Sequence, residues 1–511
     1  MQWTQIKYQV WHQLQRFRPS TSGLKAPNHP PPSSIPLQLK PSIPSSISYL
    51  GNHDFQFLNL EQAFGDRIDW NFSGHGKLWT YNLNYFDYLN QPNLSPKEGL
   101  ALIHDFIQQI ANSKDGIEPF PTSLRMVNWI KFLRRFQLRE ELIDRSLWQQ
   151  LIHLNANLEY RLMGNHLLEN AVSLLFGAYY FEEKALIKKA EQLLESQLEE
   201  QILADGAHFE LSPMYHQLML FRVLDCINLL QENEGLKGVK ILSLLKEKAV
   251  LMLGWMEQMA FSNGDLADVN DSAFGIAPMK DQLIDYADRL GLLPKKVPLK
   301  DCGYRKVHSG NYEVLVDIGQ IGPDYIPGHA HSDTFNFILY HQSEPVIVDT
   351  GISTYEKNER RRLERSTQSH NTVMINGLEQ SEVWGGFRVA RRARVVDYKE
   401  TANQICATHN GYQRINSLHQ RCFTFFDQQI EIEDRIDSDQ KASAFFHFHP
   451  KHTLELSQHT LSWHSGKIEL FNPIAVRLEP YELAIGFNQT QSSLKLVVDF
   501  QRKLMSKIIL S

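Results

Sequence analysis

The first half of the chain carries the hydrophobic spacing of amphipathic helices. Between about residues 95 and 292, apolar side chains recur three and four positions apart, the repeat that puts them on one face of a helix. The helices that this repeat predicts span residues 100–110, 124–136, 142–162, 167–181, 185–203, 214–230 and 241–259. Their connections are short and contain helix stops and starts such as Gly164-Asn165 and Ser212-Pro213. Consecutive antiparallel helices without strands between them favour an α/α toroid or solenoid, with a simple bundle as the alternative.

After Pro294 the pattern changes to short runs rich in β-branched and aromatic residues, bounded by turn residues. The predicted strands are residues 312–316, 334–340, 346–348, 372–375, 393–398, 420–426, 430–436, 444–448, 468–471 and 494–500. Strands of this number and spacing predict antiparallel sheets packed as a sandwich. A charged run at residues 359–365 interrupts them, and we expect either an exposed loop or a short helix there.

The length of the chain predicts more than one domain. A chain of 511 residues is expected to form two domains. We predict an N-terminal arm at residues 1–50, an α/α toroid at residues 51–296 and a β-sandwich at residues 297–511. Residues 19–47 of the arm are rich in Pro and Ser, which favours extended backbone without a core. Aromatic residues crowd positions 55–89, either as a packing layer or as a platform on which sugars stack.

Charge and cysteine content narrow the classes of function. The net charge of −6 and the pI of about 6.4 give no whole-protein argument for binding nucleic acid or a membrane surface, although local basic clusters can still bind polyanions. Four widely spaced cysteines without a C-x-x-C pair favour buried free thiols over disulfides. The N-terminus lacks the apolar region and cleavage site of a secretion signal, and no run of about 18 uncharged apolar residues occurs. We therefore expect a cytoplasmic protein, or a periplasmic one if the true start lies upstream.

Candidate metal ligands follow the predicted domain boundary. His331, Asp349 and His370 offer the imidazole and carboxylate donors that suit Zn²⁺. His329 lies two positions before His331, and in a strand both would project to the same face, so that one could ligate while the other faces a substrate. The alternative is a set of histidines that are hydrogen-bonded at a domain interface without a metal.

The helical half contributes two further polar clusters. Asn165, His166 and Glu169 lie at the start of a predicted helix, where polar groups can meet an anion or simply cap the helix. A second cluster of titratable groups lies between two helices and consists of Asp205, His208, Glu210, Tyr215 and His216. Such crowding at a turn between helices favours a functional site.

Four motifs carry a resemblance to a known family. They are N-H-x-x-x-N at residues 165–170, D-G-x-x-x-E-x-S-x-x-Y-H at residues 205–216, H-x-H-x-D at residues 329–333 and S-H-N-T at residues 369–372. In this order and spacing, the chain resembles the heparinase II/III family of polysaccharide lyases. The resemblance implies an incomplete α/α toroid followed by an antiparallel β-sandwich. It also implies β-elimination of a uronic-acid-containing polysaccharide, so the expected partner is an acidic polysaccharide and not a nucleic acid.

The same resemblance implies roles for single residues. It makes Tyr215 the catalytic tyrosine and His329 the catalytic histidine, which together would supply the base for the C5 proton and the acid for the departing oxygen. Asn165 or His166 would neutralise the uronate carboxylate, because ionising the C5 position beside that charge would otherwise accumulate negative charge. The ligands of a structural zinc ion would be His331, Asp349 and His370.

Substrate contacts are expected from residues near these groups. The candidates are Glu169, His208, Glu210, Arg365, Trp384 and Arg388. For the arginine clusters at residues 360–365 and 388–394, a solvated charged surface is the alternative. Two other functions stay open. One is a glycoside hydrolase that would use a carboxylate pair from Asp205, Glu169 and Glu210, and the other is a capsule or exopolysaccharide protein that handles its polymer without cleaving it.

Overall fold

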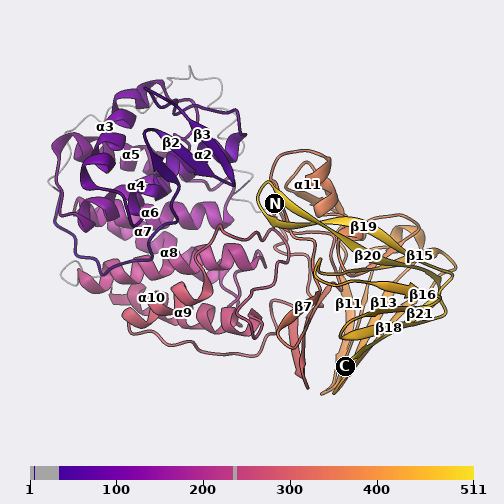
Figure 1. Ribbon diagram of the computed structural model, residues 1–511. Coiled ribbons are helices and arrows are strands. Elements are labelled where there is room, and N and C mark those ends of the chain that lie inside the picture. The colour runs from indigo at the N-terminus through magenta and orange to yellow at the C-terminus, as the bar shows by residue number, and fades with distance from the viewer. Residues whose placement is uncertain (1–4, 6–33, 234–238) are drawn as a thin grey trace. The chain divides into compact units, whose positions relative to one another are not determined.

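The structure is a computed structural model that describes Gln5, residues 34–233 and residues 239–511. By their internal contacts these residues form two units that are interleaved along the chain (Figure 1). The first unit contains the residues up to Ile202 together with Gln217–Leu253 and Pro278–Pro294, and the second contains Leu203–His216, Gly254–Ala277 and Lys295–Ser511. The segment that carries Tyr215 therefore belongs to the same unit as His329.

Helices dominate the first unit, and they confirm the predicted helical half of the chain. They are α2 (Lys77–Tyr85), α3 (Pro96–Gln109), α4 (Pro119–Arg135), α5 (Glu141–Ala156), α6 (Gly164–Tyr180), α7 (Lys184–Gln201), α8 (Pro213–Glu232), α9 (Val239–Met259) and α10 (Lys280–Arg289). The first residues of α8 and the last of α9 belong to the second unit. α6 packs against α4, α5 and α7 and is buried along almost its whole length, as expected for a helix with few polar residues. In the described part of the chain, no helix is long and apolar enough to cross a membrane.

The aromatic segment at residues 55–89 is mainly a packing layer. It forms part of a small antiparallel sheet, β1 (Tyr49–Gly51), β2 (Asp54–Phe57) and β3 (Leu60–Ala63), and then α2. Trp70, Trp79 and Tyr88 are almost completely buried, and the indole of Trp79 donates to the carbonyl of Leu60. Since covered rings cannot stack on a sugar, these three side chains belong to the core.

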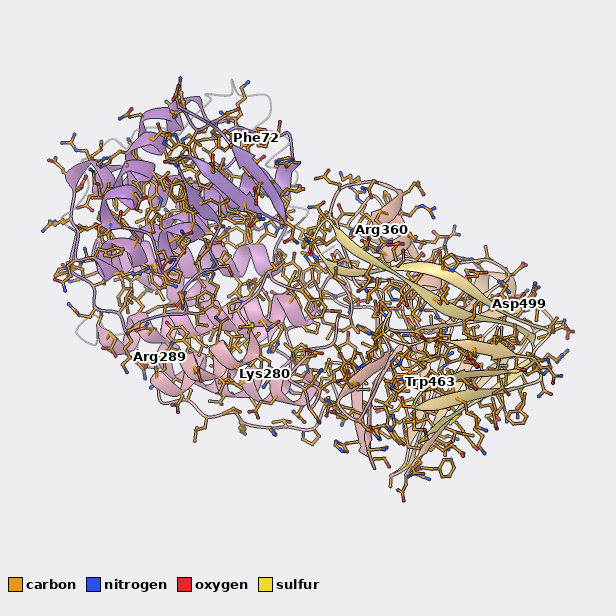
Figure 2. The ribbon with its side chains drawn as sticks, in the orientation of Figure 1. Phe72, Lys280, Arg289, Arg360, Trp463 and Asp499 are labelled. Atoms are coloured by element: carbon orange, nitrogen blue, oxygen red, sulfur yellow. A yellow bond between two sulfur atoms is a disulfide. The ribbon has the colours of Figure 1, made fainter. Side chains whose placement is uncertain are left out.

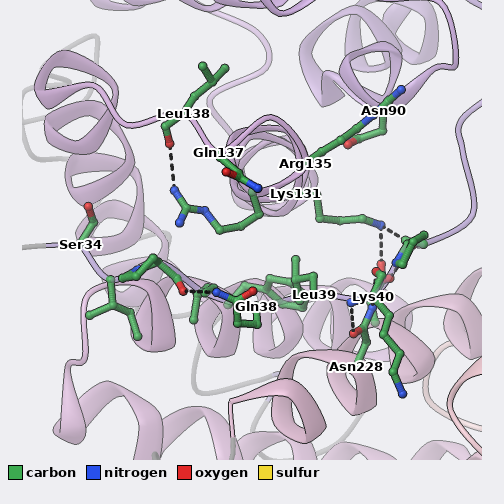
Figure 3. A pocket seen from close by; sticks show the side chains of 18 of the residues that line it. Ser34, Gln38, Leu39, Lys40, Asn90, Lys131, Arg135, Gln137, Leu138 and Asn228 are labelled. Atoms are coloured by element: carbon green, nitrogen blue, oxygen red, sulfur yellow. Dashed lines mark hydrogen bonds and ion pairs between the residues drawn. The ribbon is translucent and has the colours of Figure 1, made fainter.

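The arm runs extended but contributes buried side chains. Residues 34–48 form no helix or strand, yet Leu37 and Ile43 are buried, which corrects the expectation of an arm without a core. Lys131 of α4 donates to the hydroxyl of Ser42 at 3.0 Å and so holds the arm beside this helix (Figure 3). The arm and α4 together line a cavity of about 820 Å³.

Antiparallel strands dominate the second unit and confirm the predicted β-sandwich. The strands are β4 (Tyr304–Ser309), β5 (Tyr312–Asp317), β6 (Phe337–His341), β7 (Glu344–Ile347), β8 (Val373–Ile375), β9 (Glu382–Trp384), β10 (Arg388–Ala390), β11 (Val395–Glu400), β12 (Gln404–His409), β13 (His419–Phe426), β14 (Gln429–Ile436), β15 (Lys441–His447), β16 (Glu455–Ser457), β17 (Thr460–Trp463), β18 (Gly466–Phe471), β19 (Ala475–Gly486), β20 (Gln489–Gln501) and β21 (Lys503–Leu510). One sheet has the order β11-β12-β13-β14-β21-β18-β17-β16, two others have the orders β19-β20-β15-β8 and β4-β5-β6-β7, and β9 pairs with β10 as a hairpin. The charged run forms a short helix, α11 (Glu359–Glu364).

One apolar core joins the three sheets. It includes Val314 of β5, Ile432 of β14 and Val498 of β20. Trp463 of β17, labelled in Figure 2, also belongs to this core. Its ring packs on that of Phe448, with centroids 5.5 Å apart. Burial alternates along β13 and β14 because successive side chains of a strand point to opposite faces of the sheet.

The structure corrects the prediction of four free thiols. Cys226 and Cys302 are free and buried as expected, but Cys406 and Cys422 form a disulfide. These two residues lie directly opposite each other on β12 and β13, with Cα atoms 4.0 Å apart. A separation of 16 residues contains no sign of this pairing, because only the register of the two strands brings the thiols together.

Candidate active site

Tyr215 and His329 lie face to face in the second unit. Their ring centroids are 4.1 Å apart, at an interplanar angle of 36°. Tyr215 lies in the first turn of α8, where its backbone N–H donates to the hydroxyl of Ser212, and this hydroxyl donates to the backbone carbonyl of Asp271. These hydrogen bonds connect the start of α8 to the loop that contains Asp271, whose side chain binds His329.

Asp271 is the hub of this site, and the sequence interpretation missed it. Its two carboxylate oxygens accept hydrogen bonds from Nδ1 of His329 at 2.8 Å and from Nε2 of His331 at 2.9 Å. Arg361 of α11 adds two further bonds at 2.5 and 2.7 Å. Burial alone would raise the pKa of the Asp271 carboxyl, but Arg361 and the two histidines outweigh it and hold this pKa well below its usual range. Asp271 is therefore ionised.

The ionised carboxylate decides which nitrogens of the two histidines carry hydrogen. A carboxylate without a proton can only accept, so Nδ1 of His329 and Nε2 of His331 are the donors. Nε2 of His329 is then the nitrogen with a lone pair when the ring is neutral, and it lies 3.6 Å from the Glu210 carboxylate. This nitrogen is therefore the one that points away from Asp271 and can accept a proton from a bound molecule.

Tyr215 also contacts a second tyrosine. Its hydroxyl lies 3.2 Å from the hydroxyl of Tyr355, and the Tyr355 ring lies 4.9 Å from the guanidinium carbon of Arg361. Burial raises the pKa of the Tyr215 phenol, and the nearby carboxylates of Asp271 and Glu210 raise it further. The phenol is protonated near neutral pH and can serve as an acid.

The three predicted metal ligands also lie in the second unit, close to this hub. The His331 and His370 ring centroids are 5.3 Å apart, and Nδ1 of His370 lies 2.8 Å from the Asp349 carboxylate. His331, Asp349 and His370 lie outside the strands, and so does His329. The expectation that His329 and His331 project from one strand is therefore wrong. Both imidazoles instead reach the same carboxylate from a loop.

The donor atoms of these three residues suit a metal ion, but their positions do not yet form a complete set of metal ligands. Nδ1 of His331 is buried and has no hydrogen-bond partner, and burial lowers the pKa of this imidazole to about 3, so the nitrogen keeps its lone pair. Its other nitrogen is held by Asp271, as is common for histidines that bind metals. Yet within the described ranges no three His, Cys, Asp or Glu side chains are spaced to hold a metal ion. Zinc stays a prediction.

The helical cluster lies at the start of α6 in the first unit. Met163 occupies the N-cap, so the reading of Asn165 as the capping residue is wrong, and Asn165 is buried in the first turn. His166 lies 3.2 Å from the Glu159 carboxylate. Glu169 is buried and accepts from Arg222 at 3.1 Å. The roles of Asn165, His166 and Glu169 stay predictions.

The other predicted substrate contacts lie in the second unit and differ in exposure. His208 is fully buried, and its backbone N–H donates to Nδ1 of His216, whereas Trp384 of β9 is 51% exposed. Arg388 of β10 lies over the Trp384 ring at 4.8 Å. Arg365 is buried beneath the β9–β10 hairpin, where it donates to the carbonyl of Gly386.

The sequence contained one signal for the missed hub. Arg361 and Arg365 are four residues apart, which places them on one face of a helix, and both side chains are buried. Of the other arginines of the run, Arg362 pairs with Glu359 at the exposed surface, whereas the half-buried Arg360 pairs with the buried Glu364. No such signal marks Asp271 or Tyr355.

Comparison with known proteins agrees with this arrangement. The chain matches the Heparinase II/III N-terminus at residues 108–282 and the Heparinase II/III-like, C-terminal domain at residues 292–503. It is 24% identical to a heparin-sulfate lyase of Bacteroides stercoris, over 63% of this chain and 52% of the relative, and 24% identical to that of Pedobacter heparinus, over 70% and 55%. The chain thus spans about half the length of the curated relatives it matches.

A solved structure shows the same fold. A crystal structure of heparinase III superimposes with a TM-score of 0.71 over 99% of this chain and 91% of that one, at 14% identity. The shared architecture is a helical toroid followed by a β-sandwich. Both halves of the family are therefore present in the order that the motifs predict, and the chain belongs to the heparinase II/III family.

Proposed function

We propose that this protein is a polysaccharide lyase that cleaves a uronic-acid-containing polysaccharide by β-elimination. The single observation that carries the proposal is the contact of Tyr215 with His329, whose Nδ1 is held by the ionised Asp271. The names of the two relatives, heparin-sulfate lyases, support an acidic polysaccharide as the substrate.

The two side chains suit complementary proton transfers. Nε2 of His329 would take the C5 proton of the uronate, and the electron pair of that C–H bond would form the C4–C5 double bond as the C4–O bond breaks. The departing oxygen would take the phenolic proton of Tyr215, which its raised pKa keeps in place until that step. The proton on His329 then returns to Tyr215, and the ion pair between Asp271 and the imidazolium supports the intermediate state.

The acidic hydrogen at C5 also requires that the uronate carboxylate be neutralised. Asn165 or His166, in the first turn of α6, supplies an amide or imidazole donor for this purpose in the proposal. A helix N-terminus favours an anion through its free N–H groups, which supports this assignment.

We also propose a structural zinc ion held by His331, Asp349 and His370. When bound, the metal would fix the loop that presents His329 and take no part in the proton transfers. The buried, unpartnered Nδ1 of His331 supports this role.

The hydrolase alternative finds less support. It needs a carboxylate pair, but Asp205 accepts from the backbone N–H groups of Lys300 and Cys302, and Glu169 pairs with Arg222. Glu210 is the one candidate of the three that lies beside His329.

The test is an ultraviolet-monitored assay with heparan sulfate, hyaluronan, alginate and bacterial uronans. We expect absorbance from an unsaturated uronate with the wild type, and a loss of about 1,000-fold with Tyr215→Phe or His329→Ala. Tyr398→Phe is the matched control, because Tyr398 is an exposed side chain of β11. New reducing ends without absorbance would indicate a hydrolase, and binding without cleavage would indicate the non-catalytic alternative.

A further inference from the structure

A second feature of the strand-rich unit is a groove between α11 and the β9–β10 hairpin. Its volume is about 380 Å³. The hairpin turn at Gly385 and Gly386 has positive φ at both positions, a backbone conformation that glycine adopts easily. The side chains that matter for the groove are Lys357, Arg362, Arg365 and Trp384.

The groove contains a buried cation, Arg365, with which no described carboxylate forms a direct ion pair. Arg365 is 1% exposed, and its guanidinium donates to the carbonyls of Gly386 and Ala330, each at 2.8 Å. Its Nε is buried and has no acceptor, and none of the described carboxylates pairs with it. Burial lowers the pKa of Arg365 to about 10, so the side chain stays charged at neutral pH. The carboxylates of Asp271 and Asp333 stabilise this charge only from a distance, and an anionic ligand in the groove would stabilise it further.

The rim of the groove adds cations that are free and an aromatic face that is open. Within the described part of the chain, Lys357 Nζ makes no ion pair or hydrogen bond. The guanidinium of Arg388, which lies beside the groove over the Trp384 ring, makes none among the described residues either. In contrast, Arg362 pairs with Glu359, and Arg391 pairs with Glu382 of the same hairpin. Unpaired cations beside an exposed indole suit a sugar ring that carries an anionic substituent.

The groove is also connected to the catalytic hub. Nε of Arg361 donates to the carbonyl of Gly386 at 3.1 Å, while the other nitrogens of Arg361 hold Asp271. Phe387, at the tip of the hairpin, lies 5.9 Å from the His329 ring. A sugar bound in the groove would therefore lie next to the uronate whose glycosidic bond is cleaved.

We propose that this groove is a specificity subsite for an anionic substituent, a sulfate or a carboxylate, on a sugar that neighbours the cleaved uronate. Lys357, Arg365 and Arg388 would bind the charge, and Trp384 would stack on the sugar. The proposal rests on the lyase function proposed above, and it extends that function to the choice of substrate.

The test compares kinetic constants on heparan sulfate and on its unsulfated backbone polymer. The variants are Trp384→Ala and the double variant Lys357→Ala/Arg388→Ala, whose side chains are exposed, so that folding is expected to be preserved. We expect KM to rise about 10-fold with kcat within about 2-fold. A rise confined to the sulfated polymer identifies a sulfate as the ligand, and a rise on both polymers identifies a carboxylate. Arg391→Ala is the control and should match the wild type, because Arg391 is an exposed arginine that directly follows β10 and already pairs with Glu382 of β9.

An unchanged KM on both polymers, with the wild type active, would overturn the subsite and leave the lyase function standing. If no variant or wild type cleaves any uronan, the lyase function fails, and calorimetry with a heparin-derived tetrasaccharide decides the subsite. Tetrasaccharide binding that weakens about 10-fold in the double variant but not in Arg391→Ala then supports the subsite. Equal binding by the wild type and the double variant contradicts the subsite.

Discussion

Arg361 and Asp271 form a buried pair in which two guanidinium nitrogens meet both carboxylate oxygens, at 2.5 and 2.7 Å. The pair joins α11 to the loop that follows α9, and its carboxylate also holds His329 and His331. Such a bidentate pair fixes orientation as well as charge. It therefore makes α11, a helix of six residues, part of the support of the candidate catalytic histidine.

Asp271→Asn is expected to lower kcat by about 100-fold or more, because an amide can donate to Nδ1 of His329 and so favour the wrong tautomer. It should also lower stability by about 3 kcal/mol, since Arg361 loses its charged partner while it stays buried. The assay is the absorbance of the unsaturated product, together with urea denaturation. Asp281→Asn, at an exposed position of α10, is the control. Wild-type kcat in Asp271→Asn would exclude the positioning role.

Tyr355→Phe tests the second tyrosine. Its hydroxyl lies 3.2 Å from that of Tyr215, so its loss removes a hydrogen bond from the acid without removing the acid. We expect a decrease in kcat of about 5-fold to 10-fold, the effect of one lost hydrogen bond, and little change in KM. A loss as large as that of Tyr215→Phe would instead make Tyr355 the proton donor.

Removal of the proposed zinc ion should lower stability more than it changes the chemistry. A ligand present at about 100 times its Kd stabilises the folded state by about 2.7 kcal/mol, and a chelator removes this contribution. We expect EDTA to lower Tm and equimolar zinc to restore it, with metal content measured by mass spectrometry. His370→Ala should contain no zinc, whereas His464→Ala, in the turn between β17 and β18, should keep it. A metal-free wild type that melts at the same temperature with and without zinc would contradict the site.

Acid should destabilise the β-sandwich through two buried histidines. His409 and His419 are fully buried, and burial lowers the pKa of both imidazoles. In the unfolded chain they take up protons below pH of about 6.5, so stability is full above that pH and falls by up to about 1.4 kcal/mol per pH unit for each histidine below it. Asp434, whose pKa is lowered to about 2 because Arg421 outweighs burial, adds stability that is lost only between pH 3.8 and about 2.

The measurement for this prediction is urea denaturation between pH 8 and pH 5. His409→Gln removes one titrating group, so its free energy of unfolding should depend less steeply on pH than that of the wild type. Equal slopes for the two proteins would rule out His409 as a source of the acid sensitivity.

The disulfide predicts a count of reactive thiols. In denaturant without reductant, only Cys226 and Cys302 should react with iodoacetamide, and reduction should raise the number to four. Mass spectrometry of the intact protein reads both numbers. Four modified cysteines before reduction would show that Cys406 and Cys422 are unpaired in solution.

The fold could be predicted from the sequence wherever hydrophobic periodicity is strong. The repeat at residues 167–181 predicts α6 almost to its ends, and the alternation at residues 420–426 predicts β13. Strands such as β12 and β19 were not predicted because their hydrophobic signal is weak. β12 buries Ile405, Ala407 and His409, of which only one is a large apolar residue, and Pro480 interrupts β19.

The candidate site could be predicted only in part. Tyr215 and His329 stand in recognisable motifs, whereas Asp271 lies 58 residues from His329 and in no motif at all. The contact between them depends on the tertiary fold, and no local pattern contains it. The four-residue spacing of Arg361 and Arg365 predicts a shared helix face, but only the packing of α11 shows that this face is buried.

His329 and His331, two residues apart, share one carboxylate. His329 and His331 bind the two oxygens of a single Asp271 side chain, so both imidazoles depend on the same residue. Inserting or deleting a residue between them would leave one imidazole without its anchor, even if every side chain were retained. In this loop, an insertion or deletion between the two histidines is therefore expected to harm the site more than a substitution of the residue that separates them.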